Sequence, residues 1–252
     1  MNIETYGTGK RLEIAARLCR ELPFSHLVLL PVPTTKDKAC ISKTDIPLSD
    51  TLSNLRAGSV LVGYALPAEY KNTAEIRGAE VLDLCYDEDF QAENADLSAL
   101  GALAYILSSE KRAPCDIRFG VVGYGRIGSR ITRMLLFLGA SVKVYTSKPS
   151  VSYALGECGL ATVCVSGSGC RDYDFSEIQI LINTAPKDMS EAFSGGKLPD
   201  GMRLIELASG DNFDGVEGVE RLPSIPEKMY PESAGGAYAR AVKRLILNGR
   251  KS

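Results

Sequence analysis

Short runs of valine, isoleucine and leucine recur along the chain, separated by longer segments whose apolar residues follow helical spacing. A continuous apolar run is typical of a strand that is covered on both faces, as the strands of parallel sheets are. The alternation of such runs with helical patterns indicates an α/β fold with helices on both faces of a parallel sheet. Strands are predicted at residues 27–30, 59–63, 80–84, 117–122, 141–145, 162–165, 179–182 and 203–207.

Two helical patterns indicate where the chain divides into domains. Residues 96–111 carry apolar residues at helical spacing, and this helix should stop before Pro114. Residues 233–252 repeat apolar side chains at i, i+3, i+4 and i+7. We expect two Rossmann-like three-layer α/β/α domains with mainly parallel sheets, residues 1–95 and 112–232, joined by the first helix. The second helix either closes the second domain or, as we favour, packs back towards the first.

The most specific motif is a glycine pattern that directly follows the strand predicted at 117–122. Gly123, Gly125 and Gly128 form G-x-G-x-x-G, and a helical pattern follows at once. In such a loop the first glycine allows a tight turn, the second lets a pyrophosphate approach the backbone, and the third lets helix and strand pack closely. The helix N-terminus then faces the phosphates. The residues predicted to bind a dinucleotide here are Gly123, Tyr124, Gly125, Arg126, Ile127 and Gly128.

The end of the next predicted strand indicates which dinucleotide is bound. About 20 residues after the glycine loop begins, an NAD site normally carries Asp or Glu, which binds the ribose hydroxyls. This chain has Thr146, Ser147 and Lys148 there. Two hydroxyls and an ammonium group suit the 2'-phosphate of NADP, which a carboxylate would repel. NADP is therefore the expected cofactor and NAD the less favoured one; the alternative is a solvated loop that lacks an acid.

Loops that follow two further predicted strands complete the expected cofactor site. Ligands of open parallel sheets bind beside the carboxyl ends of the strands, so these loops should border the nicotinamide half of the cofactor. Turn formation alone would also account for the Asn, Pro and Gly residues in them. The cofactor residues predicted from these loops are Asn183, Thr184, Ala185, Pro186, Ala208 and Ser209.

The composition of the chain limits its binding partners and the residues that could act in acid–base catalysis. A formal net charge of -2 leaves no basic excess for nucleic acid or an anionic membrane surface. No apolar run approaches the roughly 20 residues of a membrane span, so we expect a cytoplasmic protein. The seven cysteines contain no C-x-x-C pair and are expected to be reduced. His26 is the only histidine and lies at the start of an apolar run that predicts a strand, so we expect the acid–base groups to be Asp, Glu, Lys, Tyr or the substrate itself.

Several segments of the second half resemble the A subunit of dipicolinate synthase. They are the glycine loop 123–128, residues 182–184 and 207–209, and a closing segment at 223–235. The family's closing signature is P-G-x-P-G-x-x-A-P-x-T-A-G, and the prolines of the closing segment keep its register. The resemblance implies a two-domain, Rossmann-type dehydrogenase, and we place Pro223 among the cofactor-binding residues.

The resemblance also implies an activity. Members of the family use NADP to oxidise a cyclic dihydrodipicolinate-type intermediate of the lysine pathway to pyridine-2,6-dicarboxylate, a spore component, and they work with a flavoprotein-like B subunit. This chain departs from the family pattern where Leu100 stands in place of a Glu, and where Ser224 and Glu227 replace glycines of the closing signature. Its first domain also looks shortened by one strand–helix unit.

A dicarboxylate substrate needs cationic and polar groups to hold it. Lys10 and Arg11 follow a glycine-containing turn at a predicted helix N-terminus, which suits an anion. Asp89 lies in an acidic turn that is either part of the substrate site or simply solvated. The substrate-binding candidates are Lys10, Arg11, Asp89, Asn94 and Ser98, and the acid–base candidates are Glu206 and Glu232.

Two other functions stay open. D-2-hydroxyacid dehydrogenases share this domain plan, but they need an Arg and a His where this chain has Ser209 and Glu232, so we favour them less. An NADP-binding homologue that has lost catalysis and acts as a regulatory or assembly partner would account for Leu100. We expect the chain to form a homo-oligomer.

Overall fold

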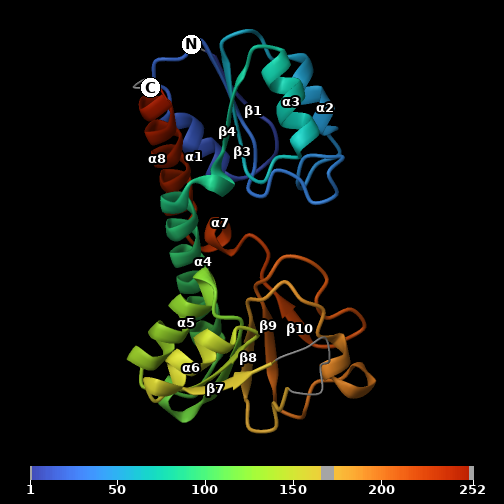
Figure 1. The fold of residues 1–252 in the computed structure, drawn as a ribbon, viewed down its shortest axis with the longest axis vertical. Coiled ribbons are helices and arrows are strands. Elements are labelled where there is room, and N and C mark those ends of the chain that lie inside the picture. Colours follow the sequence, from blue (N-terminus) through green and yellow to red (C-terminus); the bar gives the residue numbers. More distant parts are fainter. Residues whose placement is uncertain (1, 166–172, 250–252) are drawn as a thin grey trace. The chain divides into compact units, whose positions relative to one another are not determined.

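The computed structural model describes residues 2–165 and 173–249. It confirms an α/β fold with two parallel sheets, and the chain splits into two compact units (Figure 1). Unit 1 comprises Met1–Leu97 and Pro226–Ser252, and unit 2 comprises Ser98–Ile225. Helix α4 (Glu88–Ser109) contributes residues to both units.

Unit 1 is built on a four-stranded parallel sheet in the order β1-β2-β3-β4. The alternation of side chains along β2 and the residue after it places Leu27 and Leu29 with helices α1 and α8 on one face. Val28 and Leu30 lie with α2 and α3 on the other. The elements of this unit besides α4 are β1 (Asn2–Thr5), α1 (Lys10–Leu18), β2 (His26–Leu29), α2 (Leu48–Ser53), β3 (Ser59–Gly63), α3 (Ala68–Ile76), β4 (Glu80–Asp83) and α8 (Pro231–Gly249); α7 (Ile225–Met229) begins on the last residue of unit 2.

Unit 2 is built on a six-stranded parallel sheet in the order β10-β9-β8-β5-β6-β7. The strand order reverses between β5 and β8, which is the point where open α/β sheets bind ligands. The strands and helices that lie wholly in this unit are β5 (Arg118–Val122), α5 (Arg126–Phe137), β6 (Ser141–Thr146), α6 (Pro149–Glu157), β7 (Ala161–Cys164), β8 (Ile180–Asn183), β9 (Arg203–Glu206) and β10 (Val219–Arg221).

The two faces of the unit 2 sheet are covered differently. On one face the strands pack against α4 and α5 through residues such as Ile106, Ile131 and Leu135. On the other face, the described segments are loops and short 3-10 turns, which bury a chain of aromatic rings. Phe175 and Phe193 are stacked there with ring centroids 5.6 Å apart. Aromatic side chains bury large areas, so irregular segments can still cover this face.

The eight strands predicted from apolar runs are all present, each within one residue of its predicted bounds. The pattern missed β1 and β10, which lie at the edges of their sheets. Each of these strands has a single aliphatic residue, Ile3 or Val219, and both are partly exposed, so neither produces an apolar run. Helix α4 begins at Glu88, ahead of the linker helix expected at 96–111.

Three further sequence predictions concern chemistry. The cysteines in the described parts of the chain are free thiols, and Cys170 lies outside the described residues. His26 begins β2 and is buried, and its Nδ1 lies 2.9 Å from the Ser59 hydroxyl oxygen, a contact within the sheet. None of the helices described here has the length and the apolar character that crossing a membrane would require.

Candidate dinucleotide-binding site

The glycine loop joins β5 to α5 at the reversal of the unit 2 sheet. Gly123 follows the last residue of β5 and adopts a φ of +87°, which a residue with a side chain rarely takes. Its N–H donates a hydrogen bond of 2.8 Å to the carbonyl of Tyr145 in the neighbouring strand. This hydrogen bond connects the turn to the neighbouring strand. Helix α5 starts at Arg126, so its N-terminus lies beside the carboxyl ends of the strands.

The other two glycines of the loop differ in how closely other atoms pack against them. A β-carbon built on Gly128 would lie 2.0 Å from the Gly123 carbonyl oxygen, so residue 128 has to be glycine for α5 to pack here. A β-carbon built on Gly125 would meet nothing within 4 Å. The packing of the protein itself therefore does not require a glycine at 125. The open space beside its backbone is what a bound pyrophosphate needs.

The remaining residues of this loop are placed by the core. Tyr124 and Ile127 are half-buried and pack against the apolar cluster under α5, and Arg126 is exposed at the first position of that helix. Arg126 also contributes its carbonyl oxygen, which accepts hydrogen bonds from Ser129 and Arg130. No acidic side chain occurs in the first turn of α5, so the helix N-terminus stays electropositive.

The end of β6 lies beside the glycine loop, because β5 and β6 are neighbours in the sheet. Thr146 is buried, and its hydroxyl oxygen accepts a hydrogen bond of 3.2 Å from the N–H of Lys148. Ser147 and Lys148 are exposed, and Lys148 immediately precedes α6. This end of β6 thus presents a hydroxyl and an ammonium group to solvent and has no carboxylate of its own.

The loop after β8 borders the glycine loop from the other side. The hydroxyl of Thr184 donates to the carbonyl of Val122 at 2.9 Å and lies 3.3 Å from that of Gly123. Ala185 is also close to Gly123, since a β-carbon there would lie 3.2 Å from the Ala185 side chain. Pro186 follows and is exposed. The structure therefore brings together the loops after β5, β6 and β8, all of which the sequence predicts as cofactor-binding.

Glu206, the last residue of β9, connects the end of β8 to the loop after β9. Its carboxylate is 4% exposed and accepts hydrogen bonds from the Asn183 side chain at 3.1 Å and from the N–H of Ala208 at 2.7 Å. Asn212 approaches the second carboxylate oxygen at 3.5 Å. Burial raises the pKa of Glu206, while these hydrogen bonds oppose the shift. The acceptor positions of Glu206 are used within the protein, which suits a positioning residue more than an exposed base.

The last predicted cofactor residues lie beyond Glu206. Ser209 is exposed, and its carbonyl accepts a hydrogen bond from Asn212 at 3.3 Å. Pro223 is exposed in the segment after β10, where the N–H of Leu222 donates to the carbonyl of Glu206. Asn212 itself was not predicted from the sequence, because an Asn in a Gly-Asp-Asn segment is typical of an ordinary turn.

The predicted substrate residues of unit 1 lie around the start of α1 and on α4. Lys10 is exposed, whereas Arg11 is buried and donates from Nη2 to the Asn94 side chain at 3.1 Å. Asp89 is exposed and forms an ion pair of 3.4 Å with Arg244 on α8. Glu232 is exposed at the start of α8 and pairs with Arg17 on α1 at 3.2 Å.

Ser98 and Leu100 both lie on the part of α4 that belongs to unit 2. Ser98 is buried there. Leu100 is 43% exposed on the same helix and borders a hollow of about 340 Å³ together with Phe137 and Leu138 of the α5 end. This hollow is almost wholly apolar.

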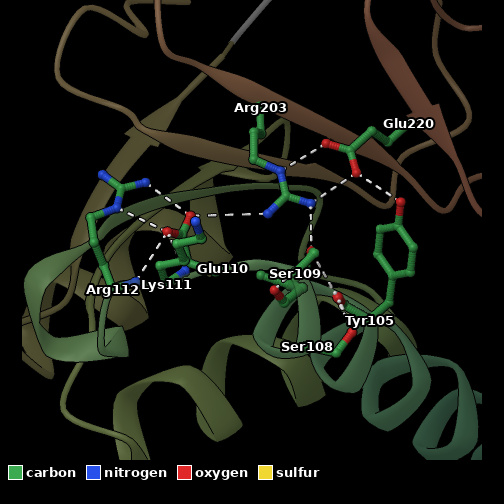
Figure 2. Close-up of polar contacts among 9 residues, drawn as sticks. Tyr105, Ser108, Ser109, Glu110, Lys111, Arg112, Arg203 and Glu220 are labelled. Carbon is green, nitrogen blue, oxygen red and sulfur yellow. Dashed lines mark hydrogen bonds and ion pairs between the residues drawn. The ribbon is translucent and has the colours of Figure 1, made fainter.

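A second polar cluster in unit 2 lies away from the loops that follow β5, β6 and β8 (Figure 2). Arg203, the first residue of β9, donates to Glu220 of β10 at 2.8 Å and to the Ser109 hydroxyl at the end of α4 at 3.0 Å. Tyr105 of α4 donates to the same Glu220 at 2.9 Å. Arg203 lies at the amino end of its strand, whereas the glycine loop follows the carboxyl end of β5. This cluster therefore joins α4 to the opposite end of the strands.

Comparisons with known proteins bear on the fold. No family model matches the chain, and no curated protein matches it by sequence. Its structure is similar to the dipicolinate synthase A chain from Bacillus subtilis, with a TM-score of 0.72 and 20% identity over 98% of this chain and 96% of that one. The corresponding dipicolinate synthase chain from Bacillus halodurans gives a TM-score of 0.74 and 17% identity, with 97% of each chain covered.

A D-isomer specific 2-hydroxyacid dehydrogenase from Lactobacillus delbrueckii ssp. bulgaricus, solved as its NAD complexed form, is also similar. It gives a TM-score of 0.50 and 12% identity over 100% of this chain and 98% of that one. The chain therefore has a Rossmann-type dehydrogenase fold similar to that of dipicolinate synthase A. At these identities the likeness establishes the fold.

Proposed function

We propose that the protein is an NADP-dependent oxidoreductase of the dipicolinate synthase A type. The observation that carries the proposal is the geometry of the glycine loop at the reversal of the unit 2 sheet. Gly123 makes the turn, Gly128 allows the close packing, and Gly125 leaves the backbone open, which is how the glycines of a dinucleotide site divide their roles. The likeness of the fold to dipicolinate synthase A supports the same interpretation.

The choice of NADP rests on the end of β6. The pyrophosphate would lie against the N-terminus of α5, where the helix dipole favours negative charge. The ribose that follows would reach Thr146, Ser147 and Lys148, where a hydroxyl and an ammonium group can bind a 2'-phosphate. An acid at this place would instead favour NAD. We therefore propose NADP as the preferred cofactor.

The proposed reaction is the oxidation of a dihydrodipicolinate-type intermediate to pyridine-2,6-dicarboxylate. The ring carbon loses a hydride to NADP, and a neighbouring position loses a proton, so the ring becomes aromatic. The cofactor supplies the hydride acceptor when bound. The loops after β8 and β9, which Glu206 holds together through Asn183 and Ala208, would orient the nicotinamide. Lys10 and Arg11 are proposed to attract the substrate carboxylates.

A turnover assay tests this function. The purified protein is incubated with NADP and the dihydrodipicolinate precursor, with and without a flavoprotein-like B subunit, and NADPH formation is followed by absorbance. We expect turnover with NADP that exceeds turnover with NAD. A Gly128→Val variant should abolish it, because a larger side chain clashes with the Gly123 carbonyl. The absence of turnover in every arm, from protein that binds NADPH, would reject the catalytic proposal.

One observation favours a second candidate, a nucleotide-binding partner without catalysis. The buried carboxylate of Glu206 has its oxygens engaged by Asn183, Ala208 and Asn212, so it is not poised to take a proton from a substrate. Such a protein would bind NADPH and alter the activity of a B subunit or another partner while showing no turnover itself. The assay above separates the two candidates.

A further inference from the structure

A carboxylate of unit 1 lies against the N-terminus of α1. Gly9 precedes this helix with a φ of +134° and has no side chain that could cap it. The carboxylate of Glu227, on α7, approaches so closely that a β-carbon on residue 9 would lie 1.8 Å from its Oε1. The free N–H groups and the dipole of a helix N-terminus attract anions. Glu227 therefore occupies the place where α1 would receive a negatively charged ligand.

Two cationic side chains interact electrostatically with the same carboxylate. Lys43 lies 3.3 Å from Oε2 of Glu227 and remains partly exposed. Arg11 is only 5% exposed, and its Nε has no hydrogen-bond partner among the described residues. Burial lowers the pKa of the Arg11 guanidinium, and the attraction of Glu227 opposes that shift. A buried guanidinium with an orphaned N–H is costly unless something anionic or hydrogen-bonding meets it.

The described contacts of Arg11 do not neutralise its charge with a direct ion pair. Its Nη2 donates to the Asn94 side chain on α4 at 3.1 Å, a neutral partner, and Glu227 is attracted to it without forming a direct ion pair. The arrangement thus combines a helix N-terminus, a buried guanidinium and a partly exposed ammonium group with the carboxylate of Glu227. The first turn of α1 carries one further carboxylate, that of Glu13, which is exposed.

We propose that the N-terminal turn of α1, Arg11 and Lys43 form a carboxylate-binding site, and that Glu227 determines its specificity by filling it with the chain's own carboxylate. A free carboxylate that reaches this site meets both occupied space and like charge. Replacement of Glu227 opens the site. The inference deepens the proposed function and rests on it in one respect: a dicarboxylate substrate would have to displace Glu227 to bind here, so Glu227 sets its affinity.

Calorimetric titration with pyridine-2,6-dicarboxylate tests the site without nucleotide or turnover. We expect Glu227→Gly to bind the dicarboxylate at least tenfold more tightly than the unaltered chain does. Pyridine-2,6-dicarboxamide, which has the same shape without the charge, should show no such gain. Glu227→Gln should give a smaller gain for the dicarboxylate, because it removes the like charge but still fills the space. Adding Lys43→Met to Glu227→Gly should reduce the gain.

A matched control uses another helix N-terminus of unit 1. Glu69 is exposed in the first turn of α3, so Glu69→Gln removes one negative charge from a comparable position. It should leave dicarboxylate affinity unchanged, and an equal gain there would overturn the proposal by showing a general charge effect. No gain in a folded Glu227→Gly variant would overturn it as well. If that variant fails to fold, Glu227→Gln decides: a gain supports the site and no gain rejects it.

The result is independent of the cofactor. If the chain binds neither NADPH nor NADH, the proposed function fails while a gain in Glu227→Gly still establishes the carboxylate site. If nucleotide binds and the gain is absent, the site fails while the oxidoreductase proposal stands.

Discussion

The paired substitutions Gly125→Ala and Gly128→Ala separate nucleotide binding from packing in one loop. A β-carbon on residue 128 would lie 2.0 Å from the Gly123 carbonyl oxygen and 2.8 Å from the Thr184 hydroxyl. The loop would have to move by roughly an ångström, and overpacking of this kind costs about 1–3 kcal/mol. For a domain of about 150–250 residues each kcal/mol lowers Tm by about 2–4 °C. Gly128→Ala should therefore lower both Tm and NADPH affinity.

Gly125→Ala should behave differently. Nothing lies within 4 Å of the new methyl group, and the backbone at residue 125, with φ of -84°, is one that alanine accepts. Gly125 is the N-cap of α5, so its loss costs the free protein no more than about 1 kcal/mol. The methyl group would nevertheless fill the space that the pyrophosphate needs. We expect NADPH affinity to fall at least tenfold, or about 1.4 kcal/mol.

Differential scanning calorimetry and NADPH fluorescence titration measure the two effects on the same preparations. Gly201→Ala serves as a control for the procedure, because Gly201 also has nothing within 4 Å but lies in an exposed turn before β9, with φ of +75°. It should lower Tm through backbone strain and leave NADPH affinity unchanged. If Gly125→Ala binds NADPH as tightly as the unaltered chain does, the open space beside residue 125 has no part in nucleotide binding.

Four further substitutions test other parts of the account. Lys148→Glu should weaken NADPH binding at least tenfold more than NADH binding in parallel titrations, and equal losses would contradict the assignment of the 2'-phosphate. Ser224→Gly should raise the free energy of unfolding by about 0.5–1 kcal/mol in urea denaturation, because Ser224 has a φ of 56° that glycine adopts without strain. The hydrogen bonds from Arg112 lower the pKa of Glu110 to about 2, so its contribution to stability is present above the ordinary value of 4.5 and is lost as pH falls from there towards 2. The stability difference between the unaltered chain and Glu110→Gln should accordingly vanish at the acid end, and a constant difference would refute the ion pair. Burial raises the pKa of Glu206, so the opposite sign holds: the stability of the unaltered chain relative to Glu206→Gln should decrease as pH rises above about 4.5, measured by chemical denaturation across pH.

The sequence predicts the sheets well because their central strands are apolar on both faces. Such strands produce unbroken runs, and the order of the strands along the chain then places the glycine motif, Thr146 and Asn183 at the carboxyl ends of β5, β6 and β8. The carboxyl ends of parallel strands share one edge of the sheet, so these residues could be grouped without coordinates. Strands β1 and β10 were not predicted because each carries a single aliphatic residue, whereas β4, which is also an edge strand, carries two in succession.

The roles of individual charged side chains were much harder to predict. Glu206 looked like an acid–base candidate in the sequence, yet its neighbours in space come from β8 and from the loop after β9. Glu227 was visible only as a departure from a glycine signature. Its contact with Gly9 joins segments more than two hundred residues apart, and no local periodicity encodes such a contact. Pairwise contacts of this kind depend on tertiary packing, which a single sequence does not display.

Fluorescence titration of the purified protein with NADPH, and in parallel with NADH, tests the central claim most directly. We expect saturable binding of NADPH that is at least tenfold tighter than that of NADH, because the end of β6 offers a hydroxyl and an ammonium group and no carboxylate. Absence of binding for both nucleotides at millimolar concentration would contradict the account and leave a Rossmann-type scaffold without a dinucleotide site.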